Sequence, residues 1–224
     1  QASLEAVLAQ ALQQSQEQHG CDLLVASGDL VQGGSVEIYQ RFLLTIRRFF
    51  DAPLLCLPGN HDLIENMHLA HLPMQGLTLG SWLVAPLDSH IDNEPSAHVG
   101  LDDLQVLKQA IKASRAAHLL LATHHPMVEI NTPWLDKDRI FSIDEVMNVI
   151  SNSFGAKLRG AIFGHAHQEV EMESENGPLL GTPSTCFQFL PKSAKFAVDQ
   201  KAPGYRWLFL EADGDLTSKL ERLT

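Results

Sequence analysis

The sequence predicts one α/β domain in which layered β-sheets are flanked by helices. Apolar residues at helical spacing alternate with short apolar runs, which is typical of buried strands that alternate with helices. After residue 163 the spacing changes to an alternation of apolar and polar residues, as in strands with one buried face. The chain has 224 residues, 45% of them hydrophobic, which is enough for one substantial core. We therefore expect residues 1–224 to form a single domain.

The first half of the chain predicts three helices and three strands. Apolar residues at helical spacing run from Leu4 to Leu12, and Gly20 follows as a C-cap. A second helix is expected over residues 39–50, after Ser35 as N-cap, and a third over residues 104–111. Short apolar runs predict strands at residues 23–26, 54–57 and 82–85.

The second half predicts two more buried strands and then half-buried ones. The buried strands are expected at residues 119–122 and 161–163, with a helix between them that begins at Ser142. Ser142 and Glu145 have the spacing of a capping box. Residues 170–172 and 205–209 alternate as strands do, and Asp213-Gly214 predicts a hairpin turn.

The charge of the chain excludes one class of partner. With 16 Lys and Arg against 27 Asp and Glu, the formal charge is −11. A protein that grips a nucleic acid polymer through its phosphates needs a basic face, so we expect no such partner. A small phosphate ester is still compatible, because metal ions in a pocket reverse the local field.

The cysteines and the apolar runs indicate where the protein works. Cys21, Cys56 and Cys186 form no CxxC pair, and an odd, sparse set is typical of a reducing cytoplasm. No apolar stretch approaches the ~20 residues of a membrane span, so no membrane partner is expected. The sequence leaves a homodimer open.

Polar side chains follow four of the predicted strands at the point where each strand ends. Open α/β sheets place their ligands at the carboxyl ends of the strands, so these side chains are expected to converge. Each motif alone also has a structural interpretation, as a turn, a loop or a satisfied histidine pair. Their joint occurrence favours a site. The motifs are Ser27-Gly28-Asp29, Pro58-Gly59-Asn60-His61-Asp62, Thr123-His124-His125-Pro126 and Gly164-His165-Ala166-His167.

The donor atoms of these motifs select the chemistry. Carboxylate, amide oxygen and imidazole without thiolate suit Mn, Fe(II), Zn or Mg. His165 and His167 are two apart and would share one face of an extended segment. A carboxylate such as Asp29 can bridge two cations ~3.5–4 Å apart, the separation used in two-metal hydrolysis of phosphate esters.

These motifs, in this order through nearly the whole chain, resemble those of the calcineurin-like metallophosphoesterases. The resemblance implies a four-layer α/β sandwich of two mixed β-sheets flanked by helices. A closer resemblance, to the bacterial class III cyclic nucleotide phosphodiesterases of the CpdA/Icc type, rests on three further segments. Members of that group hydrolyse 3′,5′-cyclic AMP. The segments are Trp134-Leu135-Asp136, residues 183–189 and residues 203–207.

The resemblance implies a role for each motif residue. Asp29 would bridge two divalent metals, with Fe or Mn favoured and Zn or Mg open; Asn60, His124 and His165 would complete one site and His167 would belong to the other. His61 would hold the phosphate or protonate the leaving alkoxide, and Asp62 would orient His61. The nucleophile would be a metal-activated hydroxide. The substrate-binding residues would be Asn60, His61, His125, Thr185 and Phe187, although His125 could instead orient His124.

The ligand count departs from the family pattern. One metal has four ligands, whereas the other has only Asp29 and His167. The family supplies the missing pair from an Asp-x-His motif on a first strand, and no such motif precedes Asp29 here. We expect that N-terminal strand to lie outside these 224 residues. The alternatives are a one-metal protein and ligands supplied by another chain.

Three functions are therefore weighed. The favoured one is metal-dependent hydrolysis of a phosphodiester, 3′,5′-cyclic AMP to 5′-AMP. A phosphoesterase of broader specificity, acting on glycerophosphodiesters or other small esters, is the alternative within the enzyme class. A catalytically silent binding domain is the alternative outside it, motivated by the absent Asp-x-His.

Overall fold

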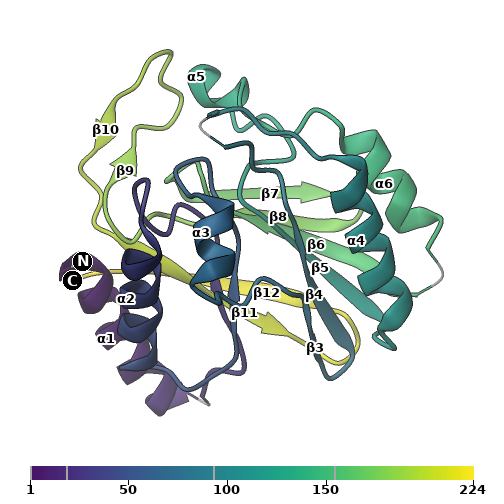
Figure 1. Ribbon diagram of the computed structural model, residues 1–224, viewed down its shortest axis with the longest axis horizontal. Helices are drawn as coiled ribbons and strands as arrows, with labels where there is room; N and C mark the ends of the chain where they lie inside the picture. Colours follow the sequence, from purple (N-terminus) through teal and green to yellow (C-terminus); the bar gives the residue numbers. More distant parts are fainter. Residues whose placement is uncertain (1, 19, 93, 154) are drawn as a thin grey trace.

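The structure is a computed structural model that describes residues 2–18, 20–92, 94–153 and 155–224 (Figure 1). The helices are α1 (Ala2–Gln18), α2 (Val36–Arg47), α3 (Ile64–Leu69), α4 (Leu101–Ala113), α5 (Pro133–Asp136) and α6 (Ile143–Ser151). The strands are β1 (Leu24–Ala26), β2 (Leu54–Cys56), β3 (Leu77–Leu79), β4 (Trp82–Leu87), β5 (His118–Thr123), β6 (Lys157–Phe163), β7 (Val170–Ser174), β8 (Gly177–Gly181), β9 (Gln188–Phe189), β10 (Val198–Asp199), β11 (Gly204–Leu210) and β12 (Leu216–Arg222).

A six-stranded mixed sheet forms the centre of the fold, in the order β3-β4-β5-β6-β8-β7. Its four inner strands are parallel, and β3 and β7 pair antiparallel at the edges. Side chains of β5 alternate between two cores, as the period of a strand requires. Leu119 and Leu121 pack with α4 and α6, whereas Leu120 and Ala122 face the opposite layer.

The opposite layer consists of two separate strand pairs. β1 and β2 are parallel, and β11 and β12 form the antiparallel hairpin predicted around Asp213-Gly214. Helices α1 and α2 cover the outer side of this layer, so helices flank both faces of the fold (Figure 1). The fold is thus the predicted α/β sandwich with a large mixed sheet and additional sheets flanked by helices.

A cavity of about 1560 Å³ separates β1 from β11. Within the described ranges β1 pairs only with β2, and β11 pairs only with β12. The apolar residues of β1 are therefore only half-buried, although they lie in the interior of the fold. Helix α1 is tied to β11, because Gln14 Oε1 accepts hydrogen bonds from Tyr205 Oη (2.6 Å) and Trp207 Nε1 (2.9 Å).

The capping box predicted at Ser142 does not form. Helix α6 begins after Ser142 as predicted, but the Ser142 side chain makes no capping hydrogen bond. One half of a capping box occurs instead at α4, where the Asp103 carboxylate accepts a 2.9 Å hydrogen bond from the backbone N–H of Gly100. In the part of the chain that the structure describes, no helix is both long and apolar enough to cross a membrane.

Candidate metal centre

The four polar motifs lie at the carboxyl ends of β1, β2, β5 and β6, as the sequence predicted. β1 and β2 are parallel in one layer, and β5 and β6 are parallel in the other. Close backbone approach makes the loops meet. A Cβ at Gly59 would clash with Asp29, and a Cβ at Gly28 would clash with the His124 ring.

Four predicted ligands converge on one point, where two histidines approach the amide oxygen of Asn60. His124 Nε2 lies 3.2 Å from Asn60 Oδ1, and His165 Nδ1 lies 3.0 Å from the same oxygen. His124 Nε2 also lies 3.4 Å from Asp29 Oδ2. We call Asp29, Asn60, His124 and His165 the four-ligand cluster.

The tautomer of His124 is set by its backbone partner. Its Nδ1–H donates to the carbonyl oxygen of Ser27 at 2.7 Å, which leaves Nε2 facing the cluster. Burial alone would lower the pKa of His124, but the nearby Asp29 carboxylate raises it. Burial would likewise raise the pKa of Asp29, but His124 and the His61 N–H hold it well below its usual range.

His165 is held neutral in the same cluster. Burial, and then the proximity of His124, lowers its pKa to about 3. Its Nδ1 faces Asn60, while its buried Nε2 has no hydrogen-bond partner among the described residues. The carboxylate of Asp138 lies 4.0 Å from that Nε2. A neutral imidazole with its second nitrogen near a carboxylate is the usual arrangement of a metal-bound histidine.

The donor set fits a divalent cation. The facing atoms are Asp29 Oδ2, Asn60 Oδ1, His124 Nε2 and His165 Nδ1. Without a cation, a proton on His124 Nε2 provides the attraction between His124 and the Asp29 carboxylate. A metal ion would replace that proton, so its binding is expected to release protons. Asp29, His165 and His167 also have positive φ angles of 54°, 55° and 48°. Strain of this kind at non-glycine residues is typical of ligand-binding sites.

His167 stands apart from the four-ligand cluster. Its Nδ1–H donates to the carbonyl oxygen of Phe187 at 2.9 Å, which leaves Nε2 free to bind a metal. Its ring stacks on Phe189 with centroids 4.4 Å apart and an interplanar angle of 9°. Its pKa is lowered by burial, so it too is neutral. The expected second site thus has Asp29 and His167 as ligands within the described residues.

His61 and Asp62 occupy different environments. The His61 side chain is exposed at the cavity, its Nδ1 lies 3.1 Å from Gln32 Nε2, and its backbone N–H donates to Asp29 Oδ1 at 2.9 Å. Asp62 is buried, and its carboxylate accepts hydrogen bonds from Gly59 N (2.9 Å), Leu30 N (3.1 Å), Val31 N (3.2 Å) and Tyr39 Oη (3.1 Å).

The contacts of Asp62 change the interpretation of its role. Among the described residues, Asp62 forms its hydrogen bonds with Gly59, Leu30, Val31 and Tyr39 and not with the His61 ring. The geometry therefore supports a loop-holding role over the expected orientation of that ring. The carboxylate ties the Asp29 loop to the Asn60 loop, and thereby fixes two of the four predicted metal ligands. Burial raises the pKa of Asp62, against the effect of its amide donors.

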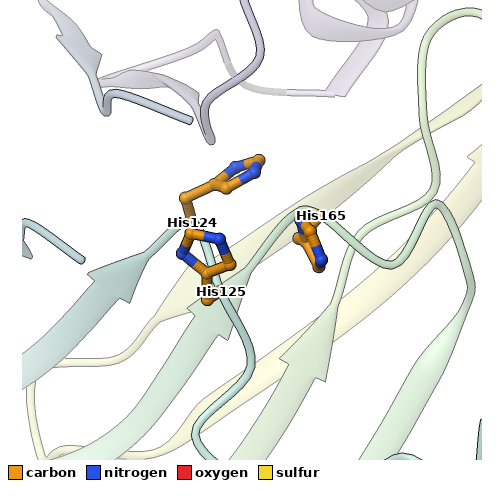
Figure 2. Close-up of side chains that lie close together, drawn as sticks. All are labelled: His124, His125 and His165. Atoms are coloured by element: carbon orange, nitrogen blue, oxygen red, sulfur yellow. The ribbon is translucent and has the colours of Figure 1, made fainter. Parts of the chain in front are cut away.

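His125 is fully buried beside the cluster. Its Nε2–H donates to the carbonyl oxygen of Pro95 at 3.2 Å, so its Nδ1 accepts from Ser89 Oγ at 2.9 Å. Figure 2 shows its ring grouped with those of His124 and His165, and the centroids lie 4.8 and 4.6 Å from them. With both nitrogens engaged, His125 supports the neighbouring ligands, and this geometry favours the orienting alternative over a substrate contact.

The two remaining predicted substrate residues line the cavity that reaches the cluster. Thr185 is half-buried and Phe187 is 42% exposed. Phe187 precedes β9, to which Phe189 belongs.

Several supporting residues were not identified from the sequence. Ser27 fixes His124 through its carbonyl, Tyr39 bonds Asp62, and Asp138 faces His165. Ser27 could have been suspected from its place in the first motif. Tyr39 and Asp138 carry no such signal, because their contacts join segments far apart in the chain.

Acid is expected to destabilise the metal-free protein through His125. Burial and the neighbouring histidines lower its pKa to about 2, against about 6.5 in an unfolded chain. The stability that depends on a neutral His125 is therefore fully present above pH 6.5. It is lost as the pH falls below that value, because the unfolded state binds a proton at His125 and the folded state does not. His125→Asn, whose Oδ1 can replace Nδ1 opposite Ser89, should reduce the loss between pH 7.5 and 5.5 by about 1 kcal/mol. Urea denaturation at both pH values measures this, and parallel losses in the two proteins would contradict it.

Comparisons with known proteins agree with this geometry. Residues 2–169 match the family described as calcineurin-like phosphoesterase. The chain is similar to 3′,5′-cyclic adenosine monophosphate phosphodiesterase CpdA of Pseudomonas aeruginosa, with 36% identity over 216 residues that cover 93% of this chain and 77% of the relative. The corresponding protein of Escherichia coli K12 is 36% identical over 212 residues, covering 92% and 76%. A 3′,5′-cyclic-nucleotide phosphodiesterase of Nostoc is 34% identical over 207 residues, covering 90% and 77%.

Solved structures show the same fold at low identity. A dimetal phosphatase from Danio rerio aligns with a TM-score of 0.59 and 12% identity, covering 98% of this chain and 89% of its own. GAP50, described as the anchor in the inner membrane complex of Plasmodium, aligns with a TM-score of 0.67 and 11% identity, covering 99% and 80%.

Proposed function

Because the chain belongs to the calcineurin-like phosphoesterase family, we propose that it hydrolyses a phosphodiester, with 3′,5′-cyclic AMP as substrate and 5′-AMP as product. The observation that carries the proposal is the convergence of Asp29, Asn60, His124 and His165 on one point. Two of its close relatives carry the name of a cyclic AMP phosphodiesterase, and a third is named for cyclic nucleotides.

We assign one group of residues to metal binding and another to substrate binding and proton transfer. Asp29, Asn60, His124 and His165 would hold one divalent ion, and Asp29 with His167 would hold part of a second, because the family uses a dinuclear site. When bound, the ions supply Lewis-acid activation of water and neutralise phosphate charge. Fe or Mn is the proposed metal, with Zn or Mg also compatible with these donors.

His61 has the access that the reaction requires. Its exposed side chain lines the cavity, and its backbone N–H donates to Asp29 Oδ1, whereas the other oxygen of that carboxylate faces His124. We assign it to bind the phosphate or to protonate the leaving 3′-alkoxide, which is ordinary general acid chemistry for histidine. We propose that Asn60, Thr185 and Phe187 contact the same substrate, because all three line the cavity that His61 also lines.

The missing ligands of the second ion are proposed to enter through the cavity between β1 and β11. Within the described residues each of these strands has a single partner, and both line the cavity together with apolar side chains of α1, α2 and the central sheet. An extended segment would pair with these strands and bury the half-exposed face of β1. The same cavity reaches His124, His165 and His167, so such a segment would arrive at the metal centre.

The direct test of the function is a hydrolysis assay. The full-length protein, supplied with Mn²⁺ or Fe²⁺, is expected to convert cyclic AMP to 5′-AMP and to cleave bis(p-nitrophenyl) phosphate. Failure to turn over either substrate, with metal bound, would reject the proposal and favour the silent binding domain. Values of kcat/KM for cyclic AMP and for glycerophosphodiesters separate the specific enzyme from the broader phosphoesterase.

The cellular setting is proposed from the cysteines. Cys21, Cys56 and Cys186 are all free thiols, which fits a reducing cytoplasm. A homodimer remains open to test by light scattering of the same full-length preparation.

Asp138 is expected to position His165 for metal binding. Asp138→Asn removes the carboxylate charge that faces Nε2, and loss of such a partner lowers metal affinity by roughly 10- to 100-fold. Competition titration with Mn²⁺ measures the change. Asp136→Asn is the matched control. Asp136 lies two residues before Asp138 in the chain, but its Oδ1 accepts a 2.7 Å hydrogen bond from Ile130 N, so its carboxylate serves a different contact. Equal affinity of the two variants would contradict the role of Asp138.

A further inference from the structure

Four aromatic side chains pack together beside the metal centre. Trp134 comes from α5, Phe189 from β9, and Phe187 and Phe196 from the chain on either side of it. Ring centroids are 5.0 Å apart for Trp134–Phe189, 5.6 Å for Trp134–Phe196, and 5.5 Å for both Phe189–Phe196 and Phe187–Phe189. We call these four residues the aromatic wall.

The aromatic wall contacts His167, a predicted metal ligand. The His167 ring stacks on Phe189 and lies 5.1 Å from the ring of Phe187. All four aromatic residues line the cavity that contains Asn60, His61 and the cluster histidines. In Figure 1 the β9–β10 segment that carries Phe189 lies at the edge of the fold next to α5. The wall therefore contacts the predicted ligand His167 directly and shares its cavity with the cluster.

The two ends of the wall differ in exposure. Phe189 and Trp134 are half-buried and pack against the main core. Phe187 is 42% exposed and Phe196 is 63% exposed. Packing around His167 explains Phe189, but it does not explain why two further phenylalanines present their rings to solvent at the cavity. Exposed aromatic rings at the edge of a mostly apolar pocket are typical of ligand contacts.

We propose that Phe187 and Phe196 form a stacking surface for the nucleobase of the substrate and so select cyclic nucleotides over phosphodiesters without a ring. This inference rests on the proposed function. A base offers a π-face that stacks on aromatic side chains, whereas a glycerol or choline group offers none. Stacking reads the face of a base rather than its edge, so the wall should assist adenine and guanine alike.

The competing occupant is a second copy of the chain. Leu190 and Val198, on the same segment, are also exposed, at 43% and 53%. An apolar interface would use the aliphatic residues as much as the rings. A nucleobase site would depend on the rings alone, and this difference decides how the variants are chosen.

The test compares Phe196→Ala, Phe187→Ala and Phe196→Leu with the control Phe141→Ala. Phe141 is 62% exposed, packs under Arg139, and does not line the cavity, so it matches Phe196 in exposure only. KM and kcat are measured for cyclic AMP, cyclic GMP and glycerophosphocholine. Binding of 5′-AMP and of ribose 5-phosphate to the metal-free protein is measured by calorimetry, and the mass of each variant by light scattering.

The expected result is a rise in KM for both cyclic nucleotides on the order of tenfold in each of the three wall variants. In the two Phe196 variants kcat should stay nearly unchanged and glycerophosphocholine hydrolysis should not change, and Phe141→Ala should resemble the wild type. The preference of the metal-free protein for 5′-AMP over ribose 5-phosphate should fall by a similar factor.

Three outcomes would overturn the inference: unchanged KM values in the wall variants, equal effects on glycerophosphocholine, or a dimer lost in Phe196→Ala but kept in Phe196→Leu. Failure of the proposed function is distinguishable from these. An inactive wild type would reject catalysis, whereas the metal-free binding preference and its loss in Phe196→Ala would still report on the wall.

Discussion

Asp29→Ala is expected to abolish metal binding at the four-ligand cluster and to lower kcat/KM for cyclic AMP by about 1000-fold or more. Metal ions stabilise the charge of a phosphoryl transition state by several kcal/mol, and each 1.36 kcal/mol is a factor of ten in rate. Asp29 supplies the one carboxylate of the cluster, where it lies 3.4 Å from His124 Nε2. Without it, one amide oxygen and two neutral imidazoles remain.

The measurement is a Mn²⁺ titration of chelator-treated protein followed by the hydrolysis assay. Asp29→Asn separates charge from local structure, because its amide oxygen can still accept the hydrogen bond that His61 N–H donates to Oδ1. Asp51→Ala, at an exposed acid between α2 and β2, is the control for loss of a surface carboxylate. If Asp29→Ala bound Mn²⁺ like Asp51→Ala, the assignment of the cluster would be wrong.

His61→Ala is expected to lower kcat by about 100- to 1000-fold while metal affinity stays near that of the wild type. General acid or base catalysis by one side chain contributes 10²–10⁴-fold, which sets this range. The His61 ring is exposed and contacts Gln32, and its link to the cluster is its backbone N–H, which alanine retains. Loss of the ring should therefore remove proton transfer or phosphate binding and leave the ligands in place.

The matched control is His68→Ala, since His68 is an exposed histidine on α3 outside every motif. Metal content after gel filtration and the pH dependence of kcat are recorded for both variants. A metal-depleted His61→Ala protein would reassign His61 from substrate handling to metal binding. A kcat equal to that of His68→Ala would remove it from the reaction.

The buried strands were the most predictable part of the fold. Residues 119–122 of β5 and 161–163 of β6 are continuous apolar runs because both of their faces are covered, and a strand of that kind is visible in the sequence. Strands β3, β9 and β10 have two or three residues each, too few for a period to be read. The separation of β1–β2 from β11–β12 was also invisible, because pairing between distant strands leaves no local pattern.

The site was predictable where chemistry follows directly after a strand. Asp29, Asn60, His124 and His165 could be grouped because parallel strands end at one edge. The choice of nitrogen could not be predicted, since it depends on the Ser27 carbonyl for His124 and on the Phe187 carbonyl for His167. The loop-holding contacts of Asp62 and the burial of His125 likewise depend on segments that approach only in the folded chain.

The most direct test of the account is anomalous diffraction at the Mn absorption edge from crystals grown with Mn²⁺. The account predicts a peak bounded by Asp29, Asn60, His124 and His165, with His124 Nε2 and His165 Nδ1 as the coordinating nitrogens. A peak elsewhere, or a protein that takes up Mn²⁺ without ordering it among these four side chains, would contradict the central claim.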